Sequence, residues 1–434
     1  MPFRKNAMHK QESDRRFQPP ASLARPAVTL IAALALLMLH STAQADDESK
    51  PDWTLGGFGS VGVVHSNERY ANFTASPTTP GSAGFTHRWS ADVDSRLGAQ
   101  LDVNLSPRWS AVLQLVSERG LDHSYTPKVE WANIKYQYSA DFSVRLGRIA
   151  LPVFINGDYR KAGYALPWVR PAVEVYGMLP ISNSDGVDAS YRWSVGEFKN
   201  VTQLFYGYDE VKISDTANAK ASNLAGLSNT TTYGALSVRA SVLTTKLDVN
   251  VARPLFDAFR QFGPQGAALA ERYDIDGKRT SVANLGFNYD PGNWFLMGEL
   301  ARMIANSYLG NNTAFYLSSG YRIGNLTPYI TYSQVKTSTA TSDPGLSLTG
   351  LPPQFAFPAA GLNAGLNQLL STIAIQHTVT LGARWDFMPN VALKLQFDHL
   401  RPQGGSSGTL IKVQPGFSSG HGINVMSAVL DFVF

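Results

Sequence analysis

The stretch RLGAQLDVNL, residues 96–105, alternates between polar and apolar side chains without a break. Every second residue from Leu97 to Leu105 is apolar, and the residues between them are arginine, glycine, glutamine, aspartate and asparagine. Successive side chains of a β-strand point to opposite faces, so the pattern predicts a strand with one apolar and one polar face. The same alternation returns at 142–147, 236–242, 379–386 and 391–398.

The predicted strands are about 9–11 residues long, which is the span of a tilted strand in a bilayer. We expect 16 of them, near 53–64, 88–105, 109–118, 129–138, 142–148, 185–193, 198–206, 232–243, 246–253, 279–289, 294–304, 314–322, 326–335, 373–387, 391–400 and 423–434. The faces of 198–206 and 326–335 are ambiguous, so 14 or 18 strands remain open. An even number is what a closed antiparallel barrel needs when both ends of the chain lie on one side.

The connections alternate between short and long. Tight turns are expected at 106–108, 139–141, 290–293, 324–325 and 388–390, and long loops near 65–87, 149–184, 207–231, 254–278, 337–372 and 401–420. Short periplasmic turns and long external loops are typical of outer-membrane barrels. Lipid offers no partner to the backbone groups of an edge strand, so such a sheet must close on itself. The fold class is therefore an all-β transmembrane antiparallel barrel, with a wide aqueous lumen at this strand count.

The N-terminal segment has the features of an export signal rather than those of a part of the folded protein. Six basic residues precede an apolar run over 27–39, and Ala43-Gln44-Ala45 follows as a small-residue cleavage site. That order is typical of a secretory signal peptide, and the run is shorter than the ~20 residues of a spanning helix. We expect residues 1–45 to be cleaved and residues 46–434 to form one barrel domain.

Charge and composition exclude several classes of function. Residues 1–45 hold six of the 37 basic and two of the 33 acidic residues, so 31 of each remain. The mature chain is neutral, which gives no support for nucleic-acid binding. Cysteine is absent, which excludes disulfides and thiolate metal sites. No segment after residue 45 reaches 18 apolar residues, so a membrane protein of this sequence would not be helical. Seven of the eight tryptophans lie near predicted strand ends, where an interfacial aromatic girdle would sit.

The segment after the fifth predicted strand carries a resemblance. Residues 151–158, LPVFINGD, resemble a Pro-Glu-Phe-Gly-Gly-Asp stretch found at this place in a known protein family. Pro152, Phe154, Gly157 and Asp158 match it. Val153 stands in place of the glutamate, and one residue is inserted. On this stretch and its position, the whole mature chain resembles the general Gram-negative porins. The resemblance implies 16 strands, a homotrimer and a third external loop folded into the lumen. It also implies that the C-terminal strand, ending in Phe432 and Phe434, is the signal read by the barrel-assembly machinery.

Porins obtain selectivity from charges at the narrowest point of the lumen. The third loop, about 149–184, carries Asp158, Arg160, Lys161, Arg170 and Glu174, and its aromatic residues are Tyr159, Tyr164, Trp168 and Tyr176. Arg148 lies just before it. Alternation places further charges on the lumen wall: Arg96, Asp102, Lys135, Arg145 and Arg239. We predict that Arg96, Lys135 and Arg145 form a basic ladder opposite the loop carboxylates. Three basic loop residues against two acidic ones indicate a weak anion preference.

The other motifs in the sequence do not indicate a cofactor, catalytic or metal site. Gly57-Phe58-Gly59-Ser60-Val61-Gly62 fits a dinucleotide-binding pattern but lacks the following helix and the acidic residue. Its glycines lie in the first strand, where they would allow close backbone contact, as between trimer subunits. The G-x-S-x-G match at 404–408 lies in a loop rather than a strand-to-helix turn. The histidines after residue 45 have no metal-ligand spacing, so we expect no metal and no cofactor.

The apolar loop 337–372 would fold over the mouth, pack on a neighbouring subunit or form a helix from Ala359 to Leu370. The leading hypothesis is a passive channel for small hydrophilic solutes and ions, embedded in outer-membrane lipid, and not an enzyme. The alternatives are a channel specific for phosphate, organic acids or sugars, and an adhesin or structural barrel.

Overall fold

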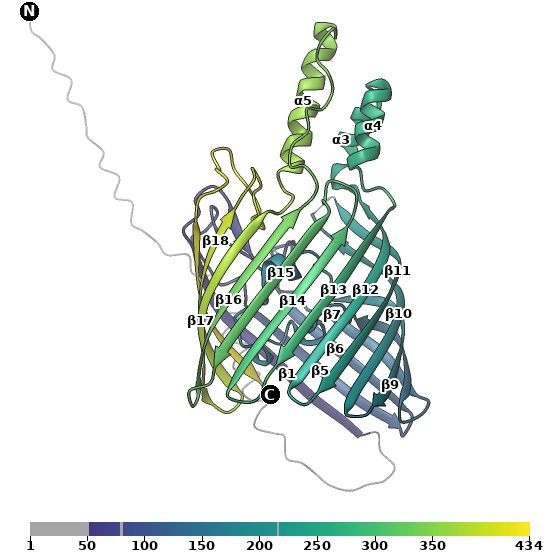
Figure 1. Cartoon of the computed structure of the whole chain (residues 1–434), viewed down its shortest axis with the longest axis vertical. Helices are drawn as coiled ribbons and strands as arrows, with labels where there is room; N and C mark the ends of the chain where they lie inside the picture. The colour runs from purple at the N-terminus through teal and green to yellow at the C-terminus, as the bar shows by residue number, and fades with distance from the viewer. Residues whose placement is uncertain (1–51, 79–80, 215–216) are drawn as a thin grey trace, which may run out of the picture. The chain divides into compact units, whose positions relative to one another are not determined.

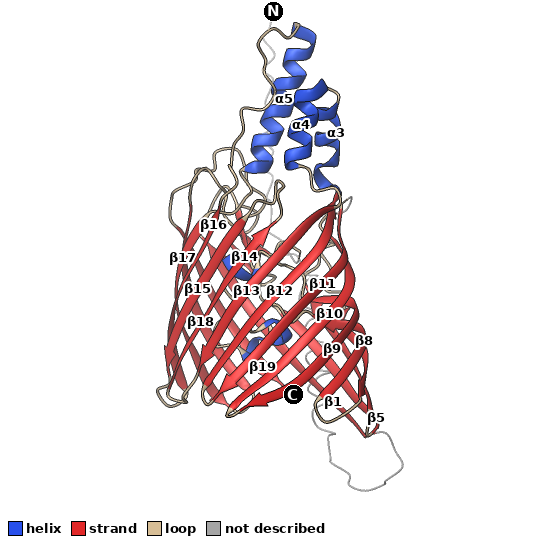
Figure 2. Cartoon of the chain, turned by 45° about the vertical axis from the view of Figure 1, so that its right-hand side comes forward, coloured by secondary structure: helices blue, strands red, loops and turns tan. Residues whose placement is uncertain are grey.

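The computed structural model describes residues 52–78, 81–214 and 217–434. The predicted signal peptide, residues 1–45, lies outside the described residues. Within them, 16 long antiparallel strands form a closed barrel, as predicted (Figures 1 and 2). The strands are β1 (Asp52–Ser66), β5 (Arg96–Ser106), β6 (Trp109–Glu118), β7 (Lys128–Gln137), β8 (Phe142–Ala150), β9 (Asn183–Val195), β10 (Phe198–Lys212), β11 (Asn218–Tyr233), β12 (Leu236–Val249), β13 (Lys278–Tyr289), β14 (Trp294–Ile304), β15 (Asn312–Tyr321), β16 (Leu326–Thr337), β17 (Gln376–Met388), β18 (Val391–Pro402) and β19 (Ile423–Val433).

The barrel closes because β1 pairs with β5 on one side and with β19 on the other. The first external loop adds a two-residue strand, β4 (Trp89–Ser90), and a small hairpin of β2 (Asn72–Thr74) and β3 (Ser82–Gly84). All the predicted tight turns are confirmed, including 290–293 and 388–390.

One strand pair was predicted at the wrong place. The segment 207–231, expected to be a loop, is mostly strand, because β10 runs on to Lys212 and β11 covers Asn218–Tyr233. The expected break at 244–245 lies inside β12, and the real turn is at Gly234-Ala235. One strand was missed and another was divided into two, so the predicted number of strands is unaffected.

Two glycines of β1 pack under aromatic rings at the C-terminal end of the chain. A Cβ on Gly57 would lie 2.3 Å from the ring of Phe434, and a Cβ on Gly59 would lie 2.2 Å from the ring of Phe432. The backbones of Gly57 and Phe434 also exchange two hydrogen bonds, of 2.8 and 3.0 Å. A close contact at these glycines therefore exists, as expected. It is made by phenylalanine rings of the same chain rather than by a neighbouring subunit.

Three helices belong to two external loops and rise beyond the strand ends (Figure 2). The β12–β13 loop holds α3 (Arg253–Arg260) and α4 (Gly263–Tyr273), and the β16–β17 loop holds α5 (Pro353–Leu370). They share a core of apolar side chains, which includes Phe256, Phe259, Leu269, Leu366 and Leu370. The apolar loop thus forms a helix six residues longer than the predicted 359–370 and packs within its own chain.

No helix in residues 52–78, 81–214 or 217–434 is long and apolar enough to cross a membrane.

Candidate functional site

The third external loop, 151–182, lies inside the barrel. It contains two short 3-10 helices, η1 (Gly157–Tyr159) and η2 (Gly163–Ala165), and one helical turn, α2 (Val173–Tyr176). Its side chains and carbonyls bond to inward residues of β12–β19, and its apolar residues join a buried cluster with β10–β16. The expected inward loop is therefore present, and its short helices are seen within the barrel (Figure 2).

Glu299 of β14 holds the start of this loop. Its carboxylate, on a side chain only 3% exposed, accepts hydrogen bonds from the Ile155 amide at 2.9 Å and the Tyr176 hydroxyl at 2.6 Å. Asn284 and Tyr316 on the wall donate two more, at 2.9 and 3.1 Å. A wall glutamate thus pins the loop where Val153 replaces the glutamate of the motif.

Arg239 of β12 bonds to the same part of the loop. Its guanidinium donates to the Phe154 carbonyl at 2.7 Å and forms an ion pair of 3.2 Å with Asp158. Ser241, two residues further along the strand, donates to the Val153 carbonyl at 2.7 Å. The predicted wall residue Arg239 and loop residue Asp158 therefore meet.

Arg170 anchors the far part of the loop. Its buried guanidinium forms ion pairs with Asp94 at 2.6 Å and with Asp398 of β18 at 2.9 Å, and it bonds to Ser427 of β19 at 2.5 Å. Burial alone would lower the pKa of Arg170, but the two facing carboxylates outweigh it, so the pKa is raised. Arg170 is therefore a fixed cation that ties the third loop to the first loop and the wall, rather than a charge facing the lumen.

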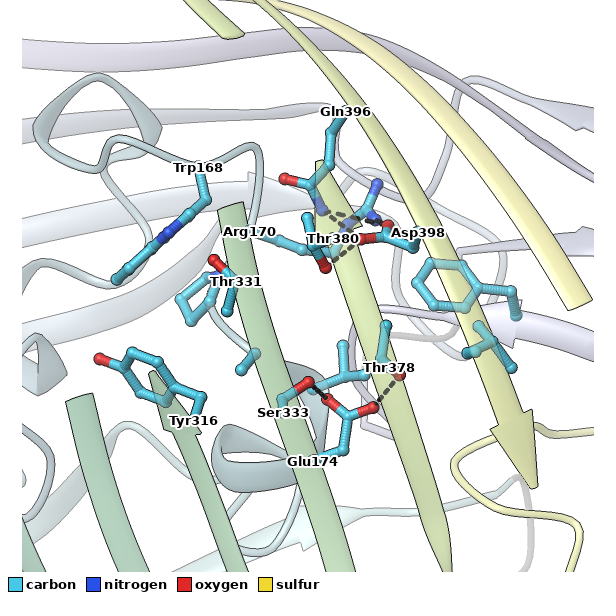
Figure 3. A pocket seen from close by; sticks show the side chains of 15 residues that line it. Trp168, Arg170, Glu174, Tyr316, Thr331, Ser333, Thr378, Thr380, Gln396 and Asp398 are labelled. Carbon is cyan, nitrogen blue, oxygen red and sulfur yellow. Dashed lines mark hydrogen bonds and ion pairs between the residues drawn. The ribbon is translucent and has the colours of Figure 1, made fainter. Parts of the chain in front are cut away.

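Glu174 is also turned into the wall. Its carboxylate accepts hydrogen bonds from Ser333 at 2.7 Å, from Gln376 at 2.7 Å and from Thr378. Between Glu174 and Arg170 lies a cavity of about 30 Å³, bounded by the loop and strands β15–β18 (Figure 3). That volume has room for about two water molecules. The two predicted loop charges thus flank a small polar space behind the loop.

A lysine that the alternation pattern did not single out provides another anchor. Lys394 of β18 is fully buried and forms an ion pair of 2.8 Å with Asp431 of β19. Its ammonium donates to the carbonyls of Gly163 at 2.6 Å and Trp168 at 2.9 Å. A buried charge is costly unless it is paired and hydrogen-bonded, and Lys394 meets both conditions.

Lys161 and Arg160 lie on the opposite side of the loop. The Lys161 ammonium pairs with Glu118 of β6 at 2.6 Å and with Glu130 of β7 at 2.9 Å. Burial opposes its charge, but the two carboxylates prevail and raise the pKa of Lys161. Arg160 donates to the carbonyls at 179 and 180, at 3.2 and 3.0 Å. The loop is therefore tied to the β6–β7 wall as well.

The lumen wall of β5–β9 carries the remaining predicted charges. Arg145 of β8 is bonded in bidentate fashion to Asp188 of β9, with a shortest distance of 2.5 Å. Lys135 of β7 lies directly across from Arg145 and has no ion pair in the described part of the chain. The expected neighbours Lys135 and Arg145 are therefore adjacent, but the carboxylate facing Arg145 belongs to the wall and not to the loop.

Three further charged residues lie on the lumen wall of β5–β9. Arg96 of β5 has no ion pair among the residues that the structure describes, although Glu118 of β6 is its cross-strand neighbour. Asp102 accepts a hydrogen bond of 2.8 Å from Gln100. Arg192 of β9, which the prediction omitted, lies four residues from Asp188 and so shares its inward face.

Arg148 does not belong with these lumen charges. It lies three positions after Arg145, an odd spacing that places the two arginines on opposite faces of β8. Arg148 shares its face with Leu146, whose side chain is 67% exposed on the outside, and it pairs with Asp185 at 2.6 Å. Including it in the constriction was wrong.

The residues that sequence reasoning missed share one property. Glu299, Lys394, Asp94 and Asp398 all bind a segment that is distant in the chain; Asp398, for instance, is 228 residues from Arg170. Polar residues on inward faces are expected in every strand of a water-filled barrel, so their presence gave no signal. The one usable sign was a charged residue in the middle of a mostly apolar strand, as Glu299 is in WFLMGELARMI.

Comparison with known proteins decides the family. The profile of the Gram-negative porin family matches residues 29–405, most of the chain. This protein is a Gram-negative porin. It is thus an outer-membrane β-barrel that forms a channel for passive diffusion, and it is not an enzyme. No curated protein matches it in sequence.

Solved structures resemble the porin in fold. The outer-membrane channel DcaP of Acinetobacter baumannii is 13% identical with a TM-score of 0.54, and the match covers 91% of this chain and 100% of that one. The anion-selective porin of Comamonas acidovorans is 15% identical with a TM-score of 0.52, covering 89% and 100%. Salmonella typhi OmpF, in complex with daunomycin, is 13% identical with a TM-score of 0.52, covering 88% and 97%.

Proposed function

We propose that the porin is a general diffusion channel for small hydrophilic solutes and ions, with a weak preference for anions. The observation that supports the preference is a group of lumen-facing cations without an ion pair in the described chain, which includes Arg96, Lys135 and Arg192. Asp102, hydrogen-bonded to Gln100, is an inward carboxylate without an ion pair in the described chain and offsets part of this positive charge. A field from unpaired charges in a narrow aqueous passage favours counter-ions.

This basis differs from the loop charges that the sequence indicated. Arg170 and Glu174 are turned into the wall, and Lys161 is neutralised by two glutamates. The structurally similar porin of Comamonas acidovorans is anion-selective, but the proposal for this chain rests on its own wall cations.

A sugar-specific channel receives less support. Stacked sugars need exposed aromatic faces, and two of the four loop aromatics are buried: Trp168 packs against Tyr316 at 5.6 Å and Tyr176 against Phe154 at 4.6 Å. A channel specific for phosphate or organic acids would use the same wall cations and would show saturable currents.

Planar-bilayer recording tests the proposal. Under a potassium chloride gradient we expect a reversal potential of the sign that indicates chloride preference. Lys135→Gln and Arg192→Gln together should move it toward cation preference. Lys246→Gln is the control, because this exposed cation of β12 shares its face with the outward Val242 and not with the lumen. A cation-selective wild type, or equal effects of the control and the double variant, would refute the preference.

The assembly of the porin is a further part of the proposal. We propose that residues 1–45 are removed on export, that the barrel-assembly machinery reads the C-terminal strand with Phe432 and Phe434, and that the mature chain forms a homotrimer. Stepwise channel openings in groups of three and a trimeric mass in mild detergent are expected. Single-step openings together with a monomeric mass would contradict the trimer.

A further inference from the structure

Arg96 of β5 and Glu118 of β6 stand directly opposite each other on the inward face of the wall. The Cβ atoms of directly opposite residues lie about 4.5–5.5 Å apart, and opposite charges in this position attract each other. The register alone therefore favours an ion pair between these two side chains. Glu118 instead pairs with a residue of the third loop.

The pairing of β8 with β9 shows what the same arrangement does without a competing cation. Arg145 is directly opposite Asp188 and binds it in bidentate fashion, with a shortest distance of 2.5 Å. Arg148 is directly opposite Asp185 and pairs with it at 2.6 Å. In the described chain, neither aspartate forms an ion pair with a residue of a loop. The β5–β6 pair differs, so its cause must be sought in the group that holds the glutamate.

Lys161 of the third loop is the group that holds Glu118. Its ammonium lies 2.6 Å from Oε1 of Glu118 and 2.9 Å from Oε2 of Glu130. Ser182, at the end of the same loop, donates a hydrogen bond of 2.5 Å to the other oxygen of Glu130. The three charged side chains are only 21%, 13% and 7% exposed, so water screens their attraction less than that of a surface pair. The lysine therefore outcompetes the arginine of β5 for Glu118.

Arg96 is left free on the lumen wall by this competition. Its side chain is half-buried, and within residues 52–78, 81–214 and 217–434 its guanidinium has neither a hydrogen bond nor an ion pair. A guanidinium with free donors can bind a passing carboxylate or phosphate through two parallel hydrogen bonds, and it attracts chloride by its charge. An ion pair with Glu118 would occupy the same donors and offset the same charge.

We propose that Lys161 is a positioning residue for ion selectivity: it holds Glu118 on the side of the loop and so keeps Arg96 free to attract anions in the lumen. This role rests on the anion preference proposed above. It does not depend on the charge of Lys161 itself, which two glutamates neutralise. Without Lys161, Glu118 would be a mostly buried carboxylate without its cation, which is costly, and Arg96 is directly across from it. The arginine would then turn to the glutamate and be lost as a lumen cation.

A double-mutant cycle on the mature porin tests the proposal, with reversal potentials recorded in planar bilayers near 10 mM potassium chloride. In the wild type, Arg96→Gln should lower the chloride-to-potassium permeability ratio by roughly threefold, the effect of one unit charge ~10 Å from a permeating ion at this ionic strength. In the Lys161→Met background the same substitution should have almost no effect, because Glu118 then offsets Arg96. Adding Glu118→Gln to Lys161→Met should restore the effect of Arg96→Gln.

Arg192 supplies the matched control cycle. It faces the lumen from β9, three strands away from Glu118 on β6, and cannot take the place of Arg96. Arg192→Gln should therefore change the permeability ratio by the same factor in the wild type and in Lys161→Met. Lys161→Arg keeps a cation on the loop and should preserve the full effect of Arg96→Gln.

An Arg96→Gln effect of equal size in the wild-type and Lys161→Met backgrounds would overturn the proposal, because the lysine would then act only through its own charge or as an anchor of the loop. Heat-modifiable migration shows that each variant is a folded barrel. Lys161→Gln, which removes the charge and keeps a hydrogen-bond donor, replaces Lys161→Met if that variant does not fold. The cycle compares changes in the ratio, so a cation-selective wild type would refute the anion preference and still leave the coupling between Lys161 and Arg96 measurable.

Discussion

Glu299 concentrates four hydrogen bonds on one buried carboxylate, two from the third loop and two from the wall. Glu299→Ala leaves the Ile155 amide and the Tyr176 hydroxyl without an acceptor, which we expect to cost about 3 kcal/mol of unfolding free energy. Urea unfolding followed by tryptophan fluorescence measures this.

The same variant should raise single-channel conductance, because the start of the loop is released from the wall. Tyr316→Phe is the control, since it removes one donor and leaves the loop amide bonded; we expect a loss of about 1 kcal/mol and no change in conductance. Unaltered conductance in Glu299→Ala would show that the remaining anchors hold the loop without it.

Asp290 and Arg322 form an ion pair between two periplasmic turns, with a shortest distance of 2.7 Å. Hydrogen bonds from Arg322 lower the pKa of Asp290 from its ordinary 3.8. A lowered folded-state pKa means that the stabilisation is present above about pH 4 and is lost as the pH falls through the folded-state value. Both side chains are more than a third exposed, so solvent screening keeps the contribution below about 1 kcal/mol.

Asp290→Asn should therefore lower the urea midpoint at pH 7 and leave it nearly unchanged at pH 2. Asp141→Asn is the matched control, because this turn carboxylate has no ion pair in the described chain. A midpoint difference that is the same at both pH values would argue against the ion pair as its cause.

At the scale of elements, the helices α3, α4 and α5 form a small apolar core together with residues of the adjoining loops and Val249 at the end of β12. Leu366 is fully buried between them, and Leu366→Ala should cost this core about 3 kcal/mol. We expect faster proteolysis at the helices, with the barrel still resistant and its conductance unchanged. Leu348→Ala, at an exposed site in the same loop, is the control. Loss of the folded barrel in Leu366→Ala would show that the helices and the strands unfold together.

The sequence revealed those elements whose two faces differ in polarity. Strand β5 was clear because its outward residues are apolar and its inward residues polar. Strand β11, NAKASNLAGLSNTTTY, was missed because polar residues occupy both faces: Asn229 and Thr231 lie on the outward side and bond to Asn200 and Thr202 of β10. A bulge between Ser222 and Ala225 breaks its alternation as well.

The candidate site was predictable in outline and not in detail. The motif at 151–158 and its place after the fifth strand were enough to predict an inward third loop. The partners of Arg170 were not predictable, since Asp94 and Asp398 reach it from a loop and a strand on either side of it in the sequence. Such pairs form only when the barrel closes. Alternation predicts that a barrel forms, but not which residues of distant segments meet inside it.

For the whole molecule, the proposed ion preference is a property of the summed lumen field. Salt screens such a field over a Debye length of about 30 Å at 0.01 M and about 3 Å at 1 M. We therefore expect the chloride-to-potassium permeability ratio to be largest at 10 mM salt and to approach that of free solution at 1 M. Reversal potentials recorded at a fixed gradient ratio over this range measure it. A ratio independent of salt would point to size exclusion rather than charge.

The seam between β1 and β19 has a consequence for biogenesis. Ser60 and Asp431 are 371 positions apart and yet share a hydrogen bond, so ring closure must wait until the last residues have crossed the inner membrane. Local pairings can form earlier, but the two exposed edges survive until then, and contacts of such long range are slow to form. The polypeptide needs protection in the periplasm during that interval, and a prematurely terminated copy would keep an open margin that recruits other strands.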